Sequence, residues 1–232
     1  MPSSICPACG QRYRPCLCVH IPRFTPRTKL VILMHPKEFK KERLGTGKMT
    51  RTAFAGSELH VDVDFTESRS VNGLITDPAN FCAVLWPGVG ALAWSGPEGL
   101  PAQLIGKRLV VFLLDGTWSC ARKMYRMSAN LQALPKIAFE PSEPSRFRIK
   151  QQPDVRCLST VETTRLLFKE MECAGLEEQQ DWDALLRPFE ELNDRQIAIA
   201  ADPARRGYRR GVYRPENTFK RALEGTRKRR LF

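Results

Sequence analysis

The sequence predicts an α/β protein with a largely parallel sheet and helices on its faces. The first observation is a set of apolar runs at Lys29–Met34, Phe81–Trp86 and Leu109–Leu114. Leu109–Leu114 is unbroken and half β-branched or aromatic, which is typical of a strand buried on both faces of a sheet. The second observation is that stretches with helical composition or spacing follow these runs. Such a succession of strands and helices favours the α/β class.

Two weaker runs are expected to complete the sheet. Val71–Ile75 is expected to form a short edge strand, and Lys136–Phe139 a fourth, shorter strand. Each is too short for its periodicity to separate a strand from other structures with certainty, so both rest on composition.

Three helical stretches are expected. Ser119–Met127 has the composition of a helix directly after the strand at Leu109–Leu114. Ser159 and Glu162 form a capping box that opens a second helix, which ends at Gly175. The apolar stripe from Trp182 to Leu192 contains Pro188, so it predicts either one kinked helix or two short ones.

The net charge of +12 is unevenly distributed along the 232 residues. The last thirty residues carry eleven Lys or Arg against two Glu, so this tail alone contributes +9. Surplus positive charge favours a polyanionic partner such as nucleic acid, and a solvated tail that only aids solubility is the alternative. Tyrosines lie between the arginines of the tail, and such a mixture can bind phosphates and stack on bases. The arginines expected to contact RNA there are Arg205, Arg206, Arg209 and Arg210.

The composition indicates a soluble intracellular protein. No apolar run approaches the roughly 20 residues that span a bilayer, and Met1–Cys6 has no basic stretch leading into an apolar one. We therefore expect a cytoplasmic location, no membrane association and no obligate protein partner. Three segments are expected: a zinc-binding segment at 1–28, a catalytic domain at 29–201 and a basic tail at 202–232.

Four of the eight cysteines lie within thirteen residues: Cys6, Cys9, Cys16 and Cys18. In a reducing compartment, clustered thiols are more consistent with metal ligands than with disulfides. Four thiolates can complete a tetrahedral Zn²⁺ site, which leaves no open position for chemistry, so a structural zinc is expected. His20 could compete as a ligand, and four unligated thiols are the alternative.

Polar residues follow the strands at their carboxyl ends, where α/β sheets bind ligands. Asp115 and Thr117 follow the strand at Leu109–Leu114, and the alternative is that Asp115 takes a turn while Thr117 caps the next helix. His35 follows the first strand, where it is either a hydrogen-bonded turn residue or an acid–base group. The glycines of Gly45-Thr46-Gly47 either let the backbone approach a ligand or form a simple turn.

Five motifs in order resemble the DTW-domain family, whose members transfer the aminocarboxypropyl group of S-adenosylmethionine to tRNA uridines. Asp115-Gly-Thr-Trp118 with Ala121-Arg-Lys-Met124 carries the signature. The other matching stretches are the cysteine cluster, His35–Glu38, Phe147–Pro153 and Leu158–Glu162, so the resemblance spans about residues 6 to 170. It implies a SPOUT-like fold whose cofactor pocket is a knotted loop region.

The resemblance also implies a site. Asp115 is the expected general base or a cofactor ligand, and Trp118 either packs beside the adenosine or braces the loop. Thr117 completes the catalytic group. The expected S-adenosylmethionine contacts are Leu85, Trp86, Pro87, Asp115, Ser159, Thr160 and Glu162, and the expected RNA contacts outside the tail are Lys48, Arg122, Arg146 and Arg148. A SPOUT-type RNA methyltransferase and a non-catalytic RNA-binding module remain alternatives.

Overall fold

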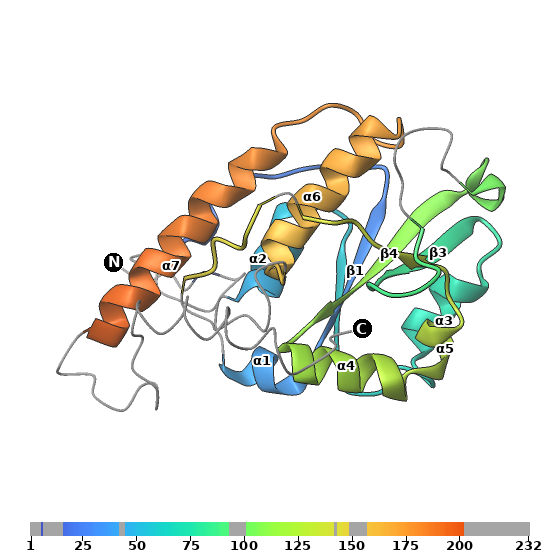
Figure 1. The fold of residues 1–232 in the computed structure, drawn as a ribbon, viewed down its shortest axis with the longest axis horizontal. Coiled ribbons are helices and arrows are strands. Elements are labelled where there is room, and N and C mark those ends of the chain that lie inside the picture. The colour runs from blue at the N-terminus through green and yellow to red at the C-terminus, as the bar shows by residue number, and fades with distance from the viewer. Residues whose placement is uncertain are drawn as a thin grey trace.

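A five-stranded parallel sheet forms the centre of the fold (Figure 1). The computed structural model describes residues 6, 16–41, 45–92, 101–141, 143–148 and 157–201. The strand order is β2-β1-β4-β3-β5, and all four pairings are parallel. The strands are β1 (Lys29–Met34), β2 (Glu58–Val61), β3 (Asn80–Leu85), β4 (Arg108–Asp115) and β5 (Lys136–Ile137).

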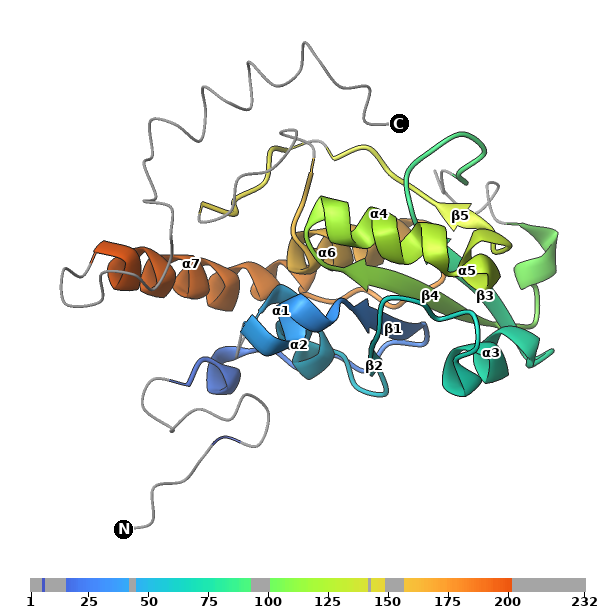
Figure 2. The ribbon, with the colours of Figure 1, turned by 90° about the horizontal axis from the view of Figure 1, so that it is seen from below.

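Helices cover both faces of this sheet. The α-helices are α1 (Pro36–Lys41), α2 (Thr46–Ala53), α3 (Arg69–Thr76), α4 (Trp118–Met127), α5 (Ala129–Gln132), α6 (Thr160–Cys173) and α7 (Leu186–Ala201). Three short 3₁₀ helices are η1 (Cys18–His20), η3 (Ala102–Leu104) and η4 (Trp182–Leu185). Figures 1 and 2 show α6 and α7 along one side of the sheet and α3, α4 and α5 toward the other.

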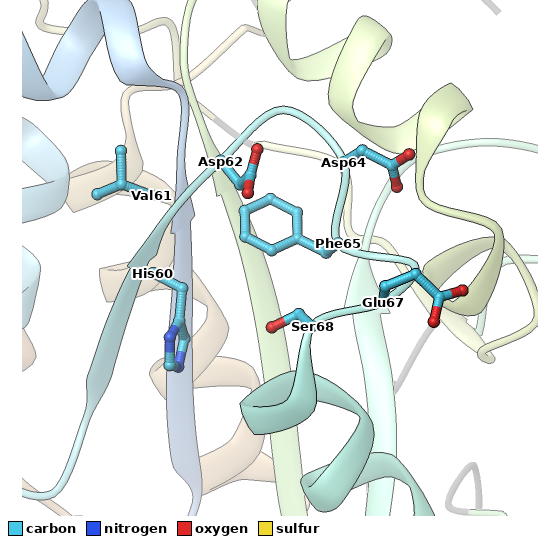
Figure 3. A pocket seen from close by; sticks show the side chains of 7 residues that line it. All are labelled: His60, Val61, Asp62, Asp64, Phe65, Glu67 and Ser68. Atoms are coloured by element: carbon cyan, nitrogen blue, oxygen red, sulfur yellow. The ribbon is translucent and has the colours of Figure 1, made fainter.

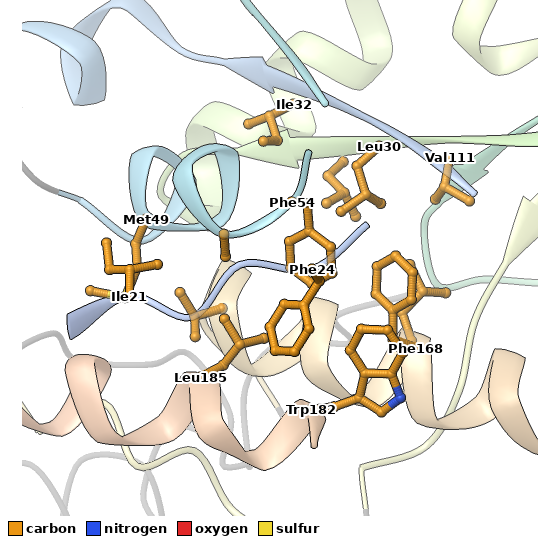
Figure 4. Packing of buried hydrophobic residues seen from close by; sticks show 14 of the residues in the cluster. Ile21, Phe24, Leu30, Ile32, Met49, Phe54, Val111, Phe168, Trp182 and Leu185 are labelled. Carbon is orange, nitrogen blue, oxygen red and sulfur yellow. The ribbon is translucent and has the colours of Figure 1, made fainter. Parts of the chain in front are cut away.

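Successive residues of the central strands alternate between two hydrophobic clusters. Leu30 and Ile32 of β1 belong to a large cluster with α2, α6, η4 and α7, whereas Val31 and Leu33 belong to one with α3, α4 and α5. The large cluster contains a stack of aromatic rings (Figure 4), in which Phe168 lies 4.6 Å from Phe54 between ring centroids and 4.8 Å from Trp182. Both faces of β1 and β4 are thus buried, as expected for strands inside a parallel sheet.

The three buried strands and the helices after them confirm the sequence predictions. The capping box is present, since Ser159 accepts from the backbone of Glu162 and the Glu162 carboxylate accepts from the backbone of Ser159. Gly175, after the end of α6, has a φ of 74°, a conformation that glycine adopts without strain. Pro188 lies in the first turn of α7, where the missing N–H has no helical partner to lose, so η4 and α7 are two successive helices.

The predicted edge strand at Val71–Ile75 is wrong. Those residues belong to α3, which Ser68 caps by accepting a hydrogen bond from the Val71 N–H. Leu74 and Ile75 follow Val71 at helical spacing and pack against the same cluster, so the apolar stripe has a helical period. The two edge strands are instead β2, whose sequence Glu58-Leu-His-Val61 is half polar, and β5.

The segment before β1 packs onto the domain. Phe24 lies 5.3 Å from Phe54 and 4.9 Å from Trp182, measured between ring centroids. Residues 202–232, which include the predicted basic tail, lie outside the described residues. Residues 149–156 do too, so the expected knot stays a prediction. No helix in the described part of the chain is long and apolar enough to cross a bilayer.

Candidate functional site

Asp115 lies where β4, α2 and α6 meet. Its register partner on β1 is Met34, so it stands at the carboxyl edge of the two central strands. The Thr160 hydroxyl at the start of α6 donates a hydrogen bond of 2.5 Å to Asp115 Oδ1. A Cβ added to Gly47 in α2 would lie 2.6 Å from Asp115 Cγ. The carboxylate is 6% exposed and is therefore held between the beginnings of two helices.

The two helix N-termini give this position its electrostatic character. Thr160 is the first residue of α6, and Gly47 is the second of α2. Unpaired N–H groups and partial positive charge at helix N-termini stabilise carboxylates. The sequence predicted Asp115 as a general base or cofactor ligand and Thr160 as a cofactor contact, but not their contact with each other. For the Gly45-Thr46-Gly47 segment it offered approach of the backbone to a ligand or a simple turn, and not the close approach of Gly47 to Asp115. The available signal was the glycine itself, because glycine inside a helix lowers the stability of the fold and is expected there mainly where a close contact excludes a side chain.

Glu162 clamps a distant segment to the beginning of α6. Its carboxylate accepts hydrogen bonds from the Ser159 N–H and hydroxyl, from the Ser145 hydroxyl and from the Arg146 N–H. The side chain is buried and fully engaged by the protein. Ser159 and Glu162, both predicted to contact the cofactor, therefore shape the loop beside Asp115.

Thr117 and Trp118 begin α4 beyond the same edge. Thr117 caps α4 by accepting from the Cys120 N–H, as the capping alternative predicted. The Trp118 ring lies 6.1 Å from that of Trp86, which in turn stacks on Tyr125 at 4.6 Å. Leu85, Trp86 and Pro87 end β3 and are all partly exposed. This aromatic group links the end of β3 to α4, a contact that the bracing alternative for Trp118 predicts and that leaves packing beside the adenosine a prediction.

His35 borders the same site from β1. Its backbone N–H donates to the Asp115 carbonyl at 2.9 Å, and its Nδ1 accepts from the Lys37 N–H at 3.1 Å. An accepting Nδ1 places the ring proton on Nε2. Burial lowers the pKa of His35, and the nearby charges of Lys37 and Lys123 lower it further. The hydrogen-bonded turn alternative therefore describes His35.

The predicted RNA contacts are placed differently from one another. Arg146 pairs with Glu190 at 3.0 Å and Arg148 with Asp194 at 2.5 Å, so both guanidinium groups tie the segment to α7. The Lys48 ammonium donates to the Phe39 carbonyl and lies 4.5 Å from its ring centroid. Arg122 is exposed on α4. The tail arginines lie outside the described residues.

A separate hollow of about 520 Å³ opens beyond β2 (Figure 3). Its lining is mostly acidic or polar: His60, Val61, Asp62, Asp64, Phe65, Glu67 and Ser68. Val61 pairs with Met34, which pairs with Asp115, so the hollow is two strands away from that carboxylate along the same edge. None of the predicted site residues lines it.

Three of the four clustered cysteines converge. The Sγ atoms of Cys6, Cys16 and Cys18 lie within 4.8 Å of one another, all buried, whereas Cys9 lies outside the described residues. The Cys18 N–H points at Cys16 Sγ at 3.3 Å, as suits an electron-rich sulfur. His20 instead pairs with Glu191 at 2.8 Å. These sulfurs fit three positions of a tetrahedral zinc site.

Comparison with known proteins assigns the family. The model of the DTW domain matches residues 3–197. The chain belongs to the DTW domain family. Its relatives include mouse and Macaca fascicularis proteins named tRNA-uridine aminocarboxypropyltransferase 2, which are 27% and 24% identical over 84% of this chain. The chain spans 65% and 64% of their lengths, and no solved structure matches it.

Proposed function

We propose that this DTW-domain chain transfers the 3-amino-3-carboxypropyl group of S-adenosylmethionine to N3 of a tRNA uridine. The observation that carries the proposal is the position of the family signature. Its aspartate, Asp115, stands at the carboxyl edge of the central strands, where ligands of α/β sheets bind. The names of the two relatives support the transferred group and the tRNA substrate.

The bound S-adenosylmethionine supplies an activated carbon, because breaking its bond to the sulfonium releases neutral methylthioadenosine. The protein's task is to align uridine N3 with that carbon and to take the N3 proton as the new bond forms. Orientation of two reactants can supply about 7–11 kcal/mol, and a positioned base contributes ~10²–10⁴-fold. We assign the uptake of this proton to the Asp115 carboxylate. The alternative is that Asp115 binds S-adenosylmethionine.

The remaining contacts surround that carboxylate. Leu85, Trp86 and Pro87 at the end of β3 and Thr160 at the beginning of α6 are proposed to hold S-adenosylmethionine. Ser159 and Glu162 are proposed to act through the loop that they shape. The strand order and this arrangement are consistent with a SPOUT-like, knotted pocket, and the cysteine cluster with a structural zinc. A cytoplasmic location follows from the proposed tRNA substrate.

Transfer and binding by the Asp115→Asn variant test the proposal. We expect single-turnover transfer to tRNA to fall by about two orders of magnitude or more, since the amide cannot accept a proton at neutral pH. Calorimetric binding of S-adenosylmethionine should persist. Loss of both would make Asp115 a cofactor ligand, and full activity would refute a catalytic role.

Mass spectrometry of the modified nucleoside identifies the reaction. An aminocarboxypropyl adduct on uridine supports the proposal, whereas a methyl adduct would show a SPOUT-type methyltransferase. Binding of tRNA with neither adduct would indicate an RNA-binding module without this activity.

A further inference from the structure

Five exposed cations gather on α1 and α4, which lie side by side in both views of the ribbon (Figures 1 and 2). They are Lys37, Lys40, Arg122, Lys123 and Arg126, which we call the α1–α4 face. Both helices bring positive charge near His35, because Lys37 from α1 and Lys123 from α4 both lower the pKa of that residue. Because α1 follows Met34 of β1 and α4 follows Asp115 of β4, both helices begin at the edge at which Asp115 stands.

The sequence of α4 explains why its cations point outward. Ala121 and Met124 are buried against the sheet, and the residues between and after them fall on the opposite side of the helix. Arg122, Lys123 and Arg126 occupy that side, and α4 contains no acidic residue. On α1 the carboxylate of Glu38 lies between Lys37 and Lys40 in the sequence, so the face as a whole carries five cations against one acidic residue.

In the part of the chain that the structure describes, none of these five side chains forms an ion pair with a carboxylate. Three exposed cations elsewhere are paired with carboxylates: Arg27 with Glu178, Lys169 with Asp183 and Arg187 with Glu191. Exposed Arg69 and Lys107 form no ion pair within the described part of the chain, but they lie outside α1 and α4. Arg146 and Arg148 are likewise occupied by the carboxylates of α7. A cluster of unpaired cations repels itself and gains free energy when an external polyanion binds.

We propose that the α1–α4 face docks the phosphate backbone of the substrate RNA and so brings its target nucleotide to the edge at Asp115. This inference rests on the proposed function for the identity of the RNA. Phosphates match the chemistry, since Arg and Lys are the residues that neutralise them. Trp118 and Trp86 border the face and offer ring surfaces for an unstacked base.

Two variants of equal net charge test the location. The face variant combines Lys40→Gln, Arg122→Gln and Arg126→Gln, and spares Lys37 and Lys123 because they act on His35. The control variant combines Arg27→Gln, Lys169→Gln and Arg187→Gln, whose cations are paired elsewhere. Affinity for unmodified tRNA is measured by fluorescence anisotropy between 50 and 200 mM salt, without S-adenosylmethionine, on the full chain.

We expect the face variant to lower the slope of log affinity against log salt by about 2, which corresponds to roughly 0.7 for each lost phosphate contact. The control variant should keep the wild-type slope. Equal losses in both variants would show that net charge alone governs binding, and an unchanged slope in the face variant would assign the contacts to other residues. Either result overturns the proposal.

Two further measurements separate this inference from the proposed function. Binding needs no transfer, so loss of slope in a chain that leaves uridine unmodified would uphold the face and refute only the reaction. Sedimentation with vesicles of phosphatidylcholine and phosphatidylserine tests the other polyanion. Vesicle binding that depends on the face, together with tRNA binding that does not, would replace RNA by a membrane surface and overturn the proposal.

Discussion

Gly47 shows how one missing side chain defines the site. Replacement by alanine would place a methyl group 2.6 Å from both Cγ and Oδ2 of Asp115, and 2.8 Å from Met34 Cε. These neighbours are buried, so the carboxylate or α2 must shift. We expect Gly47→Ala to destabilise the fold by about 1–3 kcal/mol, as overpacking does, and to abolish most transfer.

A matched control separates crowding from helix propensity. Gly73 also lies inside a helix, α3, and a Cβ there meets nothing within 4 Å. Gly73→Ala should stabilise the protein by about 0.5–1 kcal/mol, because alanine is the better helix former. Chemical denaturation of both variants checks the pair, and equal gains in stability would show that Gly47 is not crowded.

His35 predicts a pH dependence of stability. Burial and the charges of Lys37 and Lys123 hold its pKa below the value of 6.5 in the unfolded chain. Between these two pKa values the unfolded state binds more protons, so this contribution is complete above pH 6.5 and is lost as the pH falls below it. His35→Asn keeps an acceptor for the Lys37 N–H but does not titrate.

Urea denaturation at several pH values measures this contribution. The wild-type free energy of unfolding should decline more steeply than that of His35→Asn as the pH falls below 6.5. Identical slopes would show that another group is responsible for the decline.

At this scale the positions of several candidate residues could be predicted, while their roles stay predictions. Asp115, Thr117 and Thr160 come from motifs that mark strand ends and helix caps, so local patterns sufficed to place them at the ends of β4, α4 and α6. Gly47, Lys37 and Lys123 meet the site only through tertiary packing, which no local pattern encodes. The carboxylate partners of Arg146 and Arg148 lie on α7, more than forty residues away in the chain, so the sequence offered no signal for these ion pairs, and the predicted RNA contacts of both arginines stay predictions.

At the scale of elements, Glu162 stabilises the beginning of α6 in two ways. The carboxylate completes the capping box and also holds the segment at Ser145 and Arg146. Glu162→Ala leaves these donors without their partner, which costs about 1–3 kcal/mol when the groups are buried. Glu170→Ala on the same helix is the control, since its side chain makes none of these contacts.

Thermal denaturation and limited proteolysis check this prediction together. Glu162→Ala should melt at a lower temperature and expose the chain around residues 143–148 to cleavage, whereas Glu170→Ala should behave as the wild type. Equal melting of the two variants would contradict a clamping role.

The elements also show where sequence patterns fail. The central strands could be predicted because burial on both faces makes them continuously apolar. An edge strand has one partner and needs fewer apolar residues, so the sequence of β2 contains no apolar run and no strand was predicted there. The short apolar run in α3 was predicted as a strand instead. The capping residue Ser68 was the available signal for a helix there.

For the whole molecule, zinc is expected to join the N-terminal segment to the domain. Cys16 and Cys18 belong to the same buried cluster as Ile21 and Phe24. We expect one Zn²⁺ per chain, and Cys16→Ser should lose the metal and lower the melting temperature, because metal binding contributes to folding free energy.

Cys173→Ser is the matched control, as Cys173 is exposed. Burial raises the pKa of the Cys82 thiol to about 11, so this cysteine stays protonated and is no competing ligand. Elemental analysis of protein purified without added zinc gives the metal content. A zinc-free chain that remains folded would contradict the prediction.

The strand order has a consequence during synthesis. β1 pairs with β4, with Lys29 opposite Val110 and Met34 opposite Asp115. During synthesis this pairing can form only after a long stretch of chain has left the ribosome. Until then the apolar residues of β1 have just β2 beside them, and their faces lack the cover of α4 and α6. Contacts between such distant segments slow folding and prolong exposure of apolar surface. The same pairing that creates the site at Asp115 therefore leaves apolar surface of the growing chain uncovered until its central strand is complete.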